Sequence, residues 1–188
     1  MANLPKVGTN QADTFDFTGD LTNTYEIKGR GGDDSLKGGE LADFINGGKG
    51  NDVMNGNDGN DTLLGATGND VLFGGDGFDI LKGGGGVDFL NGNAGDAELT
   101  GGRGVDNFQV DLGAGRVVIA DFTDNVDTLL LDGDFFPGKS IQQILTRFGS
   151  SSGGDSAIDL SRTGADAPRL ILLGVDNIFN MIDDIVLI

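Results

Sequence analysis

The stretch 47–73 reads GGKGNDVMN, GNDGNDTLL and GATGNDVLF, three copies of the nine-residue pattern G-G-x-G-x-D-x-U-x, in which U is a large apolar residue. The pattern continues on both sides and gives nine consecutive copies from Gly29 to Gln109, numbered one to nine in chain order. A flexible glycine-rich linker, or a run of hairpin turns favoured by Asn-Gly pairs, has no reason to keep an apolar residue at every ninth position. The period therefore predicts a regular repeat structure.

The glycines of each copy predict a turn followed by a short strand. Because glycine accepts positive φ and close backbone approach, the first six residues can curl into a tight turn, and the last three can extend. In the extended part the eighth residue points inward, while the seventh and ninth point outward. The predicted core is the column of eighth residues: Leu36, Ile45, Met54, Leu63, Leu72, Leu81, Leu90, Leu99 and Phe108.

Aspartate occupies the sixth position of every copy except copy eight. Carboxylates stacked at strand spacing would repel one another strongly unless a cation lay between them. Hard oxygen ligands, carboxylates together with backbone carbonyls, select calcium over softer metals. The predicted metal-binding carboxylates are Asp34, Asp43, Asp52, Asp61, Asp70, Asp79, Asp88 and Asp106.

The nonapeptide resembles the calcium-binding repeat of the RTX (repeats-in-toxin) family. The resemblance implies an all-β fold, a right-handed parallel β-roll in which two copies form one coil and copies two apart stack. Calcium would then lie between stacked copies, at the pairs Asp34/Asp52, Asp52/Asp70, Asp70/Asp88, Asp88/Asp106, Asp43/Asp61 and Asp61/Asp79. It also implies carbonyl ligands from the second and fourth positions: Arg30, Gly32, Gly39, Leu41, Gly48, Gly50, Asn57, Gly59, Ala66, Gly68, Gly75, Gly77, Gly84, Gly86, Gly102 and Gly104.

Some copies depart from the pattern. Copy eight has Ala97 at the sixth position, and Asp96 stands one residue early, where its side chain should point differently. The seventh slot, between Asp79 and copy eight, is therefore expected to be empty or weak. Copy two has Leu41 at a glycine position, and copy one has Arg30 in place of the second glycine.

Composition connects calcium with folding and export. The formal charge is −18; about six to seven calcium ions are expected, and seven would bring the charge near −4. The metal-free repeats are expected to be disordered and to fold on binding calcium at about 10⁻⁴ to 10⁻³ M, the range of extracellular modules. The N-terminus has no signal-peptide pattern, and no segment is apolar enough to span a membrane. The acidic balance argues against a nucleic-acid partner.

RTX proteins leave the cell unfolded through type I (ABC transporter) machinery, guided by an uncleaved C-terminal signal. The ending 183–188, DDIVLI, resembles the C-terminus of exported RTX proteases and lipases, although a last β-strand alone also explains it. The resemblance implies a secreted protein, extracellular or at the cell surface. The chain has no cysteine, so no disulfide could lock it during transit.

The flanks predict caps on a roll at 29–109. Residues 8–16 look like a degenerate repeat, and 24–28 alternate as a strand, which makes 1–28 an N-terminal cap. In 110–188, strands are expected at 117–119, 129–131 and 170–173, and one helix at 140–148, with Ser140 as N-cap and Gly149 as its stop. Loops are expected at 150–154 and 163–168. This region resembles the C-terminal part of serralysin-type proteases.

No catalytic site is expected. The chain has no histidine, so it can form neither an H-E-x-x-H zinc site nor a Ser-His-Asp triad. Residues 149–153, GSSSG, match G-x-S-x-G but lack the strand-to-helix turn of a nucleophile elbow. Two alternatives stay open: a calcium-dependent ligand-binding or adhesion module with an extracellular partner such as a polysaccharide, or the non-catalytic C-terminal module of a larger secreted enzyme. Met1 and a complete C-terminal ending favour a freestanding protein.

Overall fold

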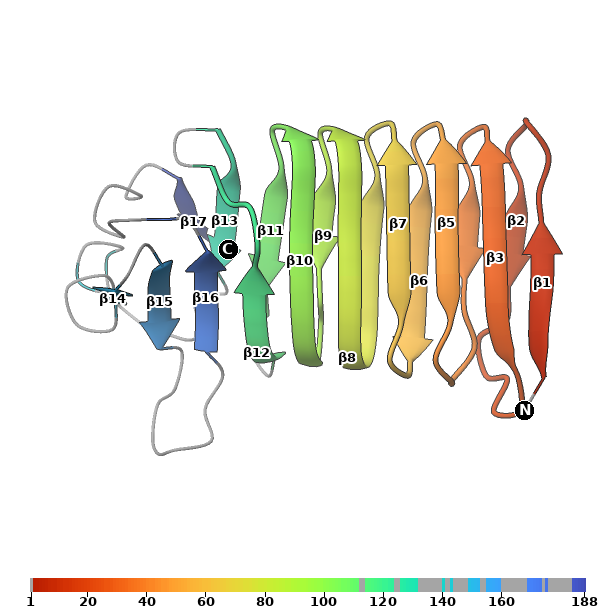
Figure 1. The fold of residues 1–188 in the computed structure, drawn as a ribbon, viewed down its shortest axis with the longest axis horizontal. Coiled ribbons are helices and arrows are strands. Elements are labelled where there is room, and N and C mark those ends of the chain that lie inside the picture. Colours follow the sequence, from red (N-terminus) through yellow and green to blue (C-terminus); the bar gives the residue numbers. More distant parts are fainter. Residues whose placement is uncertain are drawn as a thin grey trace.

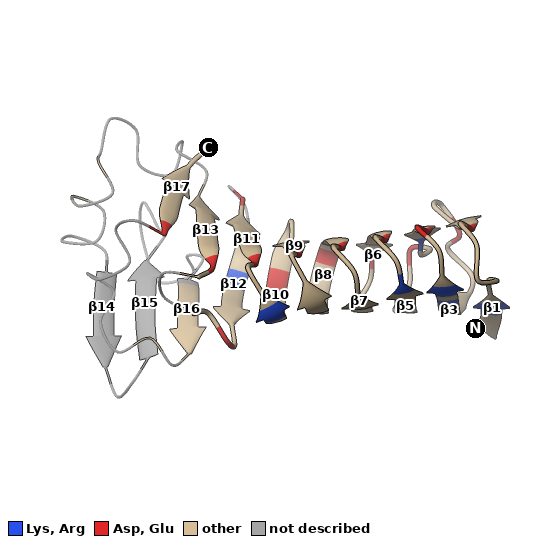
Figure 2. Cartoon of the chain, turned by 90° about the horizontal axis from the view of Figure 1, so that it is seen from above, with Lys and Arg blue, Asp and Glu red and all other residues tan. Residues whose placement is uncertain are grey.

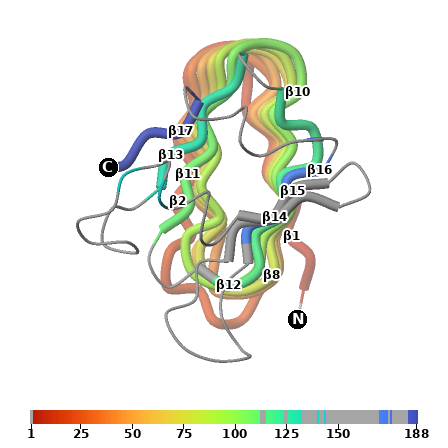
Figure 3. Tube along the Cα trace, turned by 90° about the vertical axis from the view of Figure 1, so that its left-hand side faces the viewer, coloured from red at the N-terminus to blue at the C-terminus, as the bar shows by residue number. Residues whose placement is uncertain are grey.

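The computed structural model describes residues 2–111, 114–123, 126–131, 140, 143, 149–152, 155–159, 169–173, 175 and 184–188. Its strands stack into one long parallel β-solenoid (Figure 1). Seen along the axis, the coils superpose into a flattened ring with a sheet on each long side (Figure 3). The structure confirms the predicted all-β parallel solenoid.

The two sheets take alternate strands along the chain. The first sheet contains β1 (Asn3–Val7), β3 (Thr24–Gly31), β5 (Phe44–Lys49), β7 (Thr62–Thr67), β10 (Gly95–Gly104), β12 (Ala114–Ile119) and β16 (Arg169–Leu173). The second contains β2 (Thr14–Asp16), β4 (Ser35–Lys37), β6 (Val53–Asp58), β9 (Phe89–Asn91), β11 (Asn107–Val110), β13 (Thr128–Leu131) and β17 (Ile185–Leu187). The long strand β8 (Val71–Gly86) runs around the turn and belongs to both sheets.

The register advances by two copies per coil. Val53 pairs with Val71 and Val71 with Phe89, while Thr62 pairs with Ile80 across the other sheet. Strands β4 and β9 have the predicted three residues, but others are longer: β5 begins at the seventh position of copy two and continues into the third position of copy three. Parallel pairing therefore extends into the first positions of the next copy, which were predicted to form a turn. Stacked turns of identical shape keep their backbones in register, so they can pair as well.

The eighth-position column forms the core, as predicted. Its nine side chains, from Leu36 to Phe108, are all fully buried. The column continues into the flanks through Ile27, Ile119 and Leu129. Phe15 of the degenerate repeat pairs in parallel with Leu36, so its strand is in register with that of copy one. The outward seventh position is more open, and Val53 keeps 47% of its surface exposed.

The C-terminal flank contains the three predicted strands at β12, β13 and β16. The loop predicted at 150–154 is wrong for its first part, because β14 (Gly149–Ser152) is a strand that pairs antiparallel with β15 (Asp155–Asp159), which in turn pairs with β16. Gly149 is the first residue of this strand. Pairing to an existing sheet overrides the weak local preference of Ser and Gly, since it satisfies their backbone polar groups.

Most of the predicted helix at 140–148 and the predicted turn at 163–168 lie outside the described residues. Ser140 and Gln143 are described, and they exchange two hydrogen bonds: the Ser140 N–H donates to Oε1 of Gln143 at 3.0 Å, and the Gln143 N–H donates to Oγ of Ser140 at 3.3 Å. This is the reciprocal pattern of a capping box. Within the described part of the chain, no helix is long and apolar enough to cross a membrane.

Candidate calcium-binding centres

The sixth-position aspartates form two hydrogen-bonded rows, one at each turn edge of the roll. Oδ1 of each aspartate accepts the backbone N–H of the sixth residue one coil earlier, so the Asp34 N–H donates to Asp52 and the Asp52 N–H donates to Asp70, both at 2.8 Å. The same bond joins Asp70/Asp88, Asp88/Asp106, Asp43/Asp61 and Asp61/Asp79. The structure thus brings together all six predicted pairs. Acidic segments recur coil after coil in Figure 2.

The second oxygen of these carboxylates is the unusual feature. Oδ2 is buried and accepts no hydrogen bond in six aspartates: Asp34, Asp52, Asp61, Asp70, Asp79 and Asp88. Burying an ionised carboxylate oxygen without a partner is costly, so a row of them calls for a compensating charge. A hard divalent cation fits this donor set.

The first glycine of each copy makes room for Oδ2. A methyl group on Gly29 would collide with Oδ2 of Asp34 and lie 2.5 Å from the Gly47 carbonyl oxygen of the next coil. The same collision with the copy's own aspartate occurs at Gly38, Gly47, Gly56, Gly65, Gly74, Gly83 and Gly101. The φ of this first-position glycine is outside the left-handed range, so the backbone conformation would accept other residues. Glycine is required there because a side chain would collide with the carboxylate of the same copy.

The second and fourth positions favour glycine for a different reason. Their backbone is left-handed, for example at Gly48 (φ 109°) and Gly50 (φ 119°). The non-glycine residues Arg30, Asn57 and Ala66 adopt the same conformation at the second position, with φ of 80°, 74° and 80°. A methyl group on Gly48 or Gly50 would collide with the carbonyl oxygen at the equivalent position one coil earlier. The predicted carbonyl donors therefore stack directly against the neighbouring turn.

Burial sets the protonation of the metal-free rows. It raises the pKa of Asp61 to about 8 and those of Asp70, Asp79 and Asp106 to about 6, against backbone hydrogen bonds that lower them. The folded state without metal thus holds protons that the unfolded chain, with aspartate pKa values near 4, has released. The contribution of these aspartates to the stability of the metal-free fold is therefore fully present below about pH 4 and is lost as pH rises toward about 8.

A family model supports this geometry. The model of the RTX calcium-binding nonapeptide repeat, four copies long, matches residues 28–63 and 64–99. Residues 28–99 are RTX calcium-binding nonapeptide repeats. Among the described residues no three carboxylate, histidine or cysteine side chains converge on one point. In these RTX repeats the described carboxylates therefore meet in pairs and not in larger groups.

Two solved structures resemble the chain weakly. Extracellular lipase LipA from Serratia marcescens is 14% identical with a TM-score of 0.37, over 98% of this chain and 40% of the lipase. The AlgE6R3 subunit of the Azotobacter vinelandii mannuronan C5-epimerase is 19% identical with a TM-score of 0.34, over 95% of this chain and 80% of the subunit. The chain thus spans less than half of the lipase. A comparison with curated proteins gave no significant match.

RTX repeat eight breaks its row as expected. Ala97 takes the place of the aspartate, so no carboxylate stands above Asp79, and a methyl group on Gly92 would meet the Ala97 side chain instead. Oδ1 of Asp96 accepts the backbone N–H of Arg116 at 2.8 Å, outside the row. The seventh slot therefore has one carboxylate instead of two.

RTX repeat two differs from the others in its turn. Neither Gly39 nor Leu41 adopts the left-handed backbone that the second and fourth positions have elsewhere. The Gly39 N–H donates instead to Oδ2 of Asp43 at 2.6 Å. Sequence reasoning placed Gly39, Leu41 and Asp43 with the other ligands, but the structure gives them a different local geometry.

The fifth position contains a second ladder that sequence reasoning missed. The Asn51 N–H donates to Oδ1 of Asp33, the Asn69 N–H to Oδ1 of Asn51 and the Val87 N–H to Oδ1 of Asn69, each at 2.8 Å. These side chains satisfy turn N–H groups one coil later. The signal was present in the sequence as Asn or Asp at the fifth position of five repeats, a place that the motif leaves free.

Proposed function

We propose that this chain is a secreted RTX protein that binds several calcium ions through its aspartate rows and folds on binding them after type I export. The observation that carries the proposal is the set of six buried Oδ2 atoms without a hydrogen-bond partner. Each needs positive charge beside it, and in the described part of the chain no lysine or arginine forms an ion pair with these oxygens. Calcium supplies that charge.

The carboxylates and the turn carbonyls supply different calcium ligands. Oδ1 is already used by the backbone of the preceding coil, so Oδ2 is the oxygen free to face a cation. Stacked carbonyls at the second and fourth positions supply neutral oxygens, which calcium accepts in its six to eight ligands. Of the predicted carbonyl donors, those in the left-handed turns of repeats one, three to seven and nine fit this role.

The same geometry supports coupling between binding and folding. The repeats contribute one large apolar side chain per nine residues to the core, while the chain has a net charge of −18 and 35 glycines. Without metal, folding must bury a row of carboxylates at the price of their hydration. Binding to the folded state alone therefore moves the folding equilibrium, and millimolar calcium outside the cell would switch it.

The proposal includes no catalytic activity. The segment 149–153, which matches the nucleophile pattern in sequence, contains β14 of an antiparallel hairpin instead of a strand-to-helix elbow. Export rests on the resemblance of the RTX repeats and of the ending 183–188 to exported proteins.

Circular dichroism during a calcium titration from chelator upward, with magnesium as the control ion, tests the proposal. We expect a cooperative transition from disorder to β-structure with calcium alone. Asp70→Asn should raise the calcium midpoint, whereas Asp76→Asn, which changes the same charge on an exposed third-position side chain, should not. A chain that is fully folded in chelator and indifferent to calcium would contradict the proposal.

A further inference from the structure

Three turns of the roll satisfy their own aspartate without metal. The backbone N–H four residues earlier donates to Oδ2 in each: Thr9 to Asp13 at 2.5 Å, Gly39 to Asp43 at 2.6 Å, and Thr123 to Asp127 at 2.8 Å. The second-position residues Thr9 and Gly39 also lack the left-handed φ found in the other turns. We call these closed turns, and the turns with left-handed second and fourth positions open turns.

The closed turns lie at the ends of the aspartate rows. The first row contains Asp34, Asp52, Asp70, Asp88 and Asp106; Asp13 precedes it and Asp127 follows it, each joined to the row by the same N–H to Oδ1 bond at 2.7 and 2.9 Å. The second row begins with the closed turn of Asp43 and ends at Ala97, where the carboxylate is missing. Building on the proposed function, we propose that both calcium rows are terminated at both ends by turns that bind no metal.

Tyr25 explains the end of the second row. It occupies the sixth-position column one coil before Asp43, because Glu26 pairs with Phe44. Its N–H donates to Oδ1 of Asp43 at 2.5 Å, so both oxygens of that carboxylate have backbone donors. Its side chain is 5% exposed and lies so close to the turn that a methyl group on Gly39 would be 3.2 Å from the ring. An aromatic ring therefore stands where the series would place another carboxylate.

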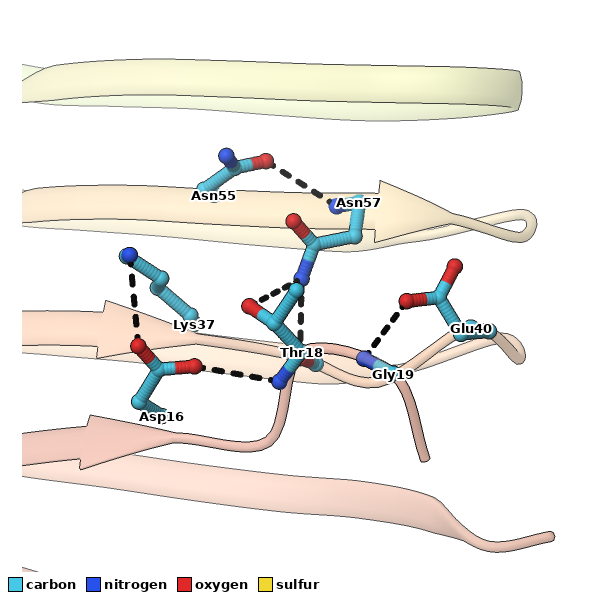
Figure 4. A network of polar contacts seen from close by, with 8 residues as sticks. Asp16, Thr18, Gly19, Lys37, Glu40, Asn55 and Asn57 are labelled. Carbon is cyan, nitrogen blue, oxygen red and sulfur yellow. Dashed lines mark hydrogen bonds and ion pairs between the residues drawn. The ribbon is translucent and has the colours of Figure 1, made fainter. Parts of the chain in front are cut away.

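The N-terminal cap fixes this ring over the turn. The Tyr25 ring stacks on Phe17 with centroids 4.0 Å apart, and its hydroxyl donates to Oδ2 of Asp20. The two residues between Phe17 and Asp20 are hydrogen-bonded to the next coils (Figure 4). The Gly19 N–H donates to Oε1 of Glu40 at 2.6 Å, and the side-chain amide of Asn57 donates to Oγ1 of Thr18 at 3.4 Å. These contacts hold the Tyr25 ring against the turn of repeat two and so stabilise the closed form of that turn.

Calcium is then confined to pairs of successive open turns that both have an aspartate. Four such pairs lie in the first row and one in the second: Asp34/Asp52, Asp52/Asp70, Asp70/Asp88, Asp88/Asp106 and Asp61/Asp79. The structure assigns five sites, four on one edge and one on the other, and removes Asp43/Asp61 from the six pairs that the sequence predicts.

Calcium stoichiometry of the purified chain, measured by isothermal titration calorimetry, tests this assignment. The matched variants are Asp43→Asn and Asp61→Asn, which remove the same charge one coil apart in one row. We expect Asp43→Asn to leave the number of bound ions unchanged and Asp61→Asn to lower it by one. Loss of one ion in Asp43→Asn with its β-structure retained would overturn the closed turn, whereas a wild-type chain that binds no calcium would overturn the proposed function itself.

A second measurement uses the unaltered chain in case Asp43→Asn does not fold. Tyr25 is the only tyrosine, and there is no tryptophan, so terbium emission excited through tyrosine reports metal near repeat two. At the spacing of stacked strands, a site at Asp43/Asp61 would lie about 7 Å from Tyr25 and the site at Asp61/Asp79 about 12 Å. We expect weak sensitised emission from the wild type and strong emission from Phe78→Tyr, since Phe78 is 43% exposed beside Asp79. Strong emission from the wild type, lost in Tyr25→Phe, would overturn the proposal.

Discussion

Replacing Gly65 by alanine should weaken calcium binding at the turn of repeat five, solely because the new methyl group collides with atoms of the site. The new methyl group would collide with Oδ2 of Asp70 and lie 2.5 Å from the Gly83 carbonyl oxygen, whereas real Cβ atoms essentially never approach closer than 3.0 Å. Gly65 does not have a left-handed φ, so alanine brings no backbone strain of its own. The cost falls on the carboxylate and carbonyl that would face calcium.

The magnitude follows from the cost of inserting a methyl group into a packed site. Overpacking of this kind costs about 1–3 kcal/mol. If the strain is felt only in the bound, folded state, the calcium midpoint rises about 1.4- to 3-fold when five ions bind in one cooperative step, and about 5- to 150-fold when a single ion binds. The assay is the midpoint of the calcium-induced change in circular dichroism, measured for wild type and variant under the same salt conditions.

Gly85→Ala is the matched control. Gly85 stands at the third position of repeat seven, also without a left-handed φ, and the nearest atom to an added methyl group is the Ala66 carbonyl oxygen at 4.0 Å. Alanine there should leave the calcium midpoint unchanged or lower it slightly, because it reduces the freedom of the unfolded chain. Equal midpoints for Gly65→Ala and Gly85→Ala would refute the inference that the first glycine is required by the aspartate beside it.

Three further predictions concern protons, the amide ladder and the core. Since burial raises the pKa of Asp61 to about 8, the chelated chain should hold more β-structure at pH 5 than at pH 8, and calcium should bind more tightly at pH 8; circular dichroism that shows more apo structure at pH 8 would contradict this. Asn69→Ala removes the acceptor of the Val87 N–H and should cost about 0.5–1 kcal/mol in calcium-saturated denaturation, while Val105→Ala, in the same column, should cost less. Leu72→Ala should cost about 2–5 kcal/mol in the same assay, far more than an alanine at the exposed Val53, and equal costs would show that the column is not the core.

The amino-acid sequence by itself determined the parts of this protein that repeat. An apolar residue at every ninth position can face inward in every coil only if the chain winds with that period, so the core from Leu36 to Phe108 could be named in advance. The six aspartate pairs followed in the same way, because equivalent residues two copies apart stack in register. The defect at Ala97 was also visible, since it is a missing side chain.

Only the tertiary structure decided which aspartates remain available to a metal. In the linear pattern Asp43 is equivalent to Asp61, yet its Oδ2 is satisfied by Gly39 while that of Asp61 has no partner. Leu41, at a glycine position of the same repeat, already marks this turn in the sequence, but the Tyr25 ring that lies against the turn, held by contacts with the N-terminal cap, is visible only in the structure. Likewise, the serines of β14 became a strand because β15 offered them backbone partners. Both outcomes depend on residues from other coils or strands, which a local repeat pattern does not encode.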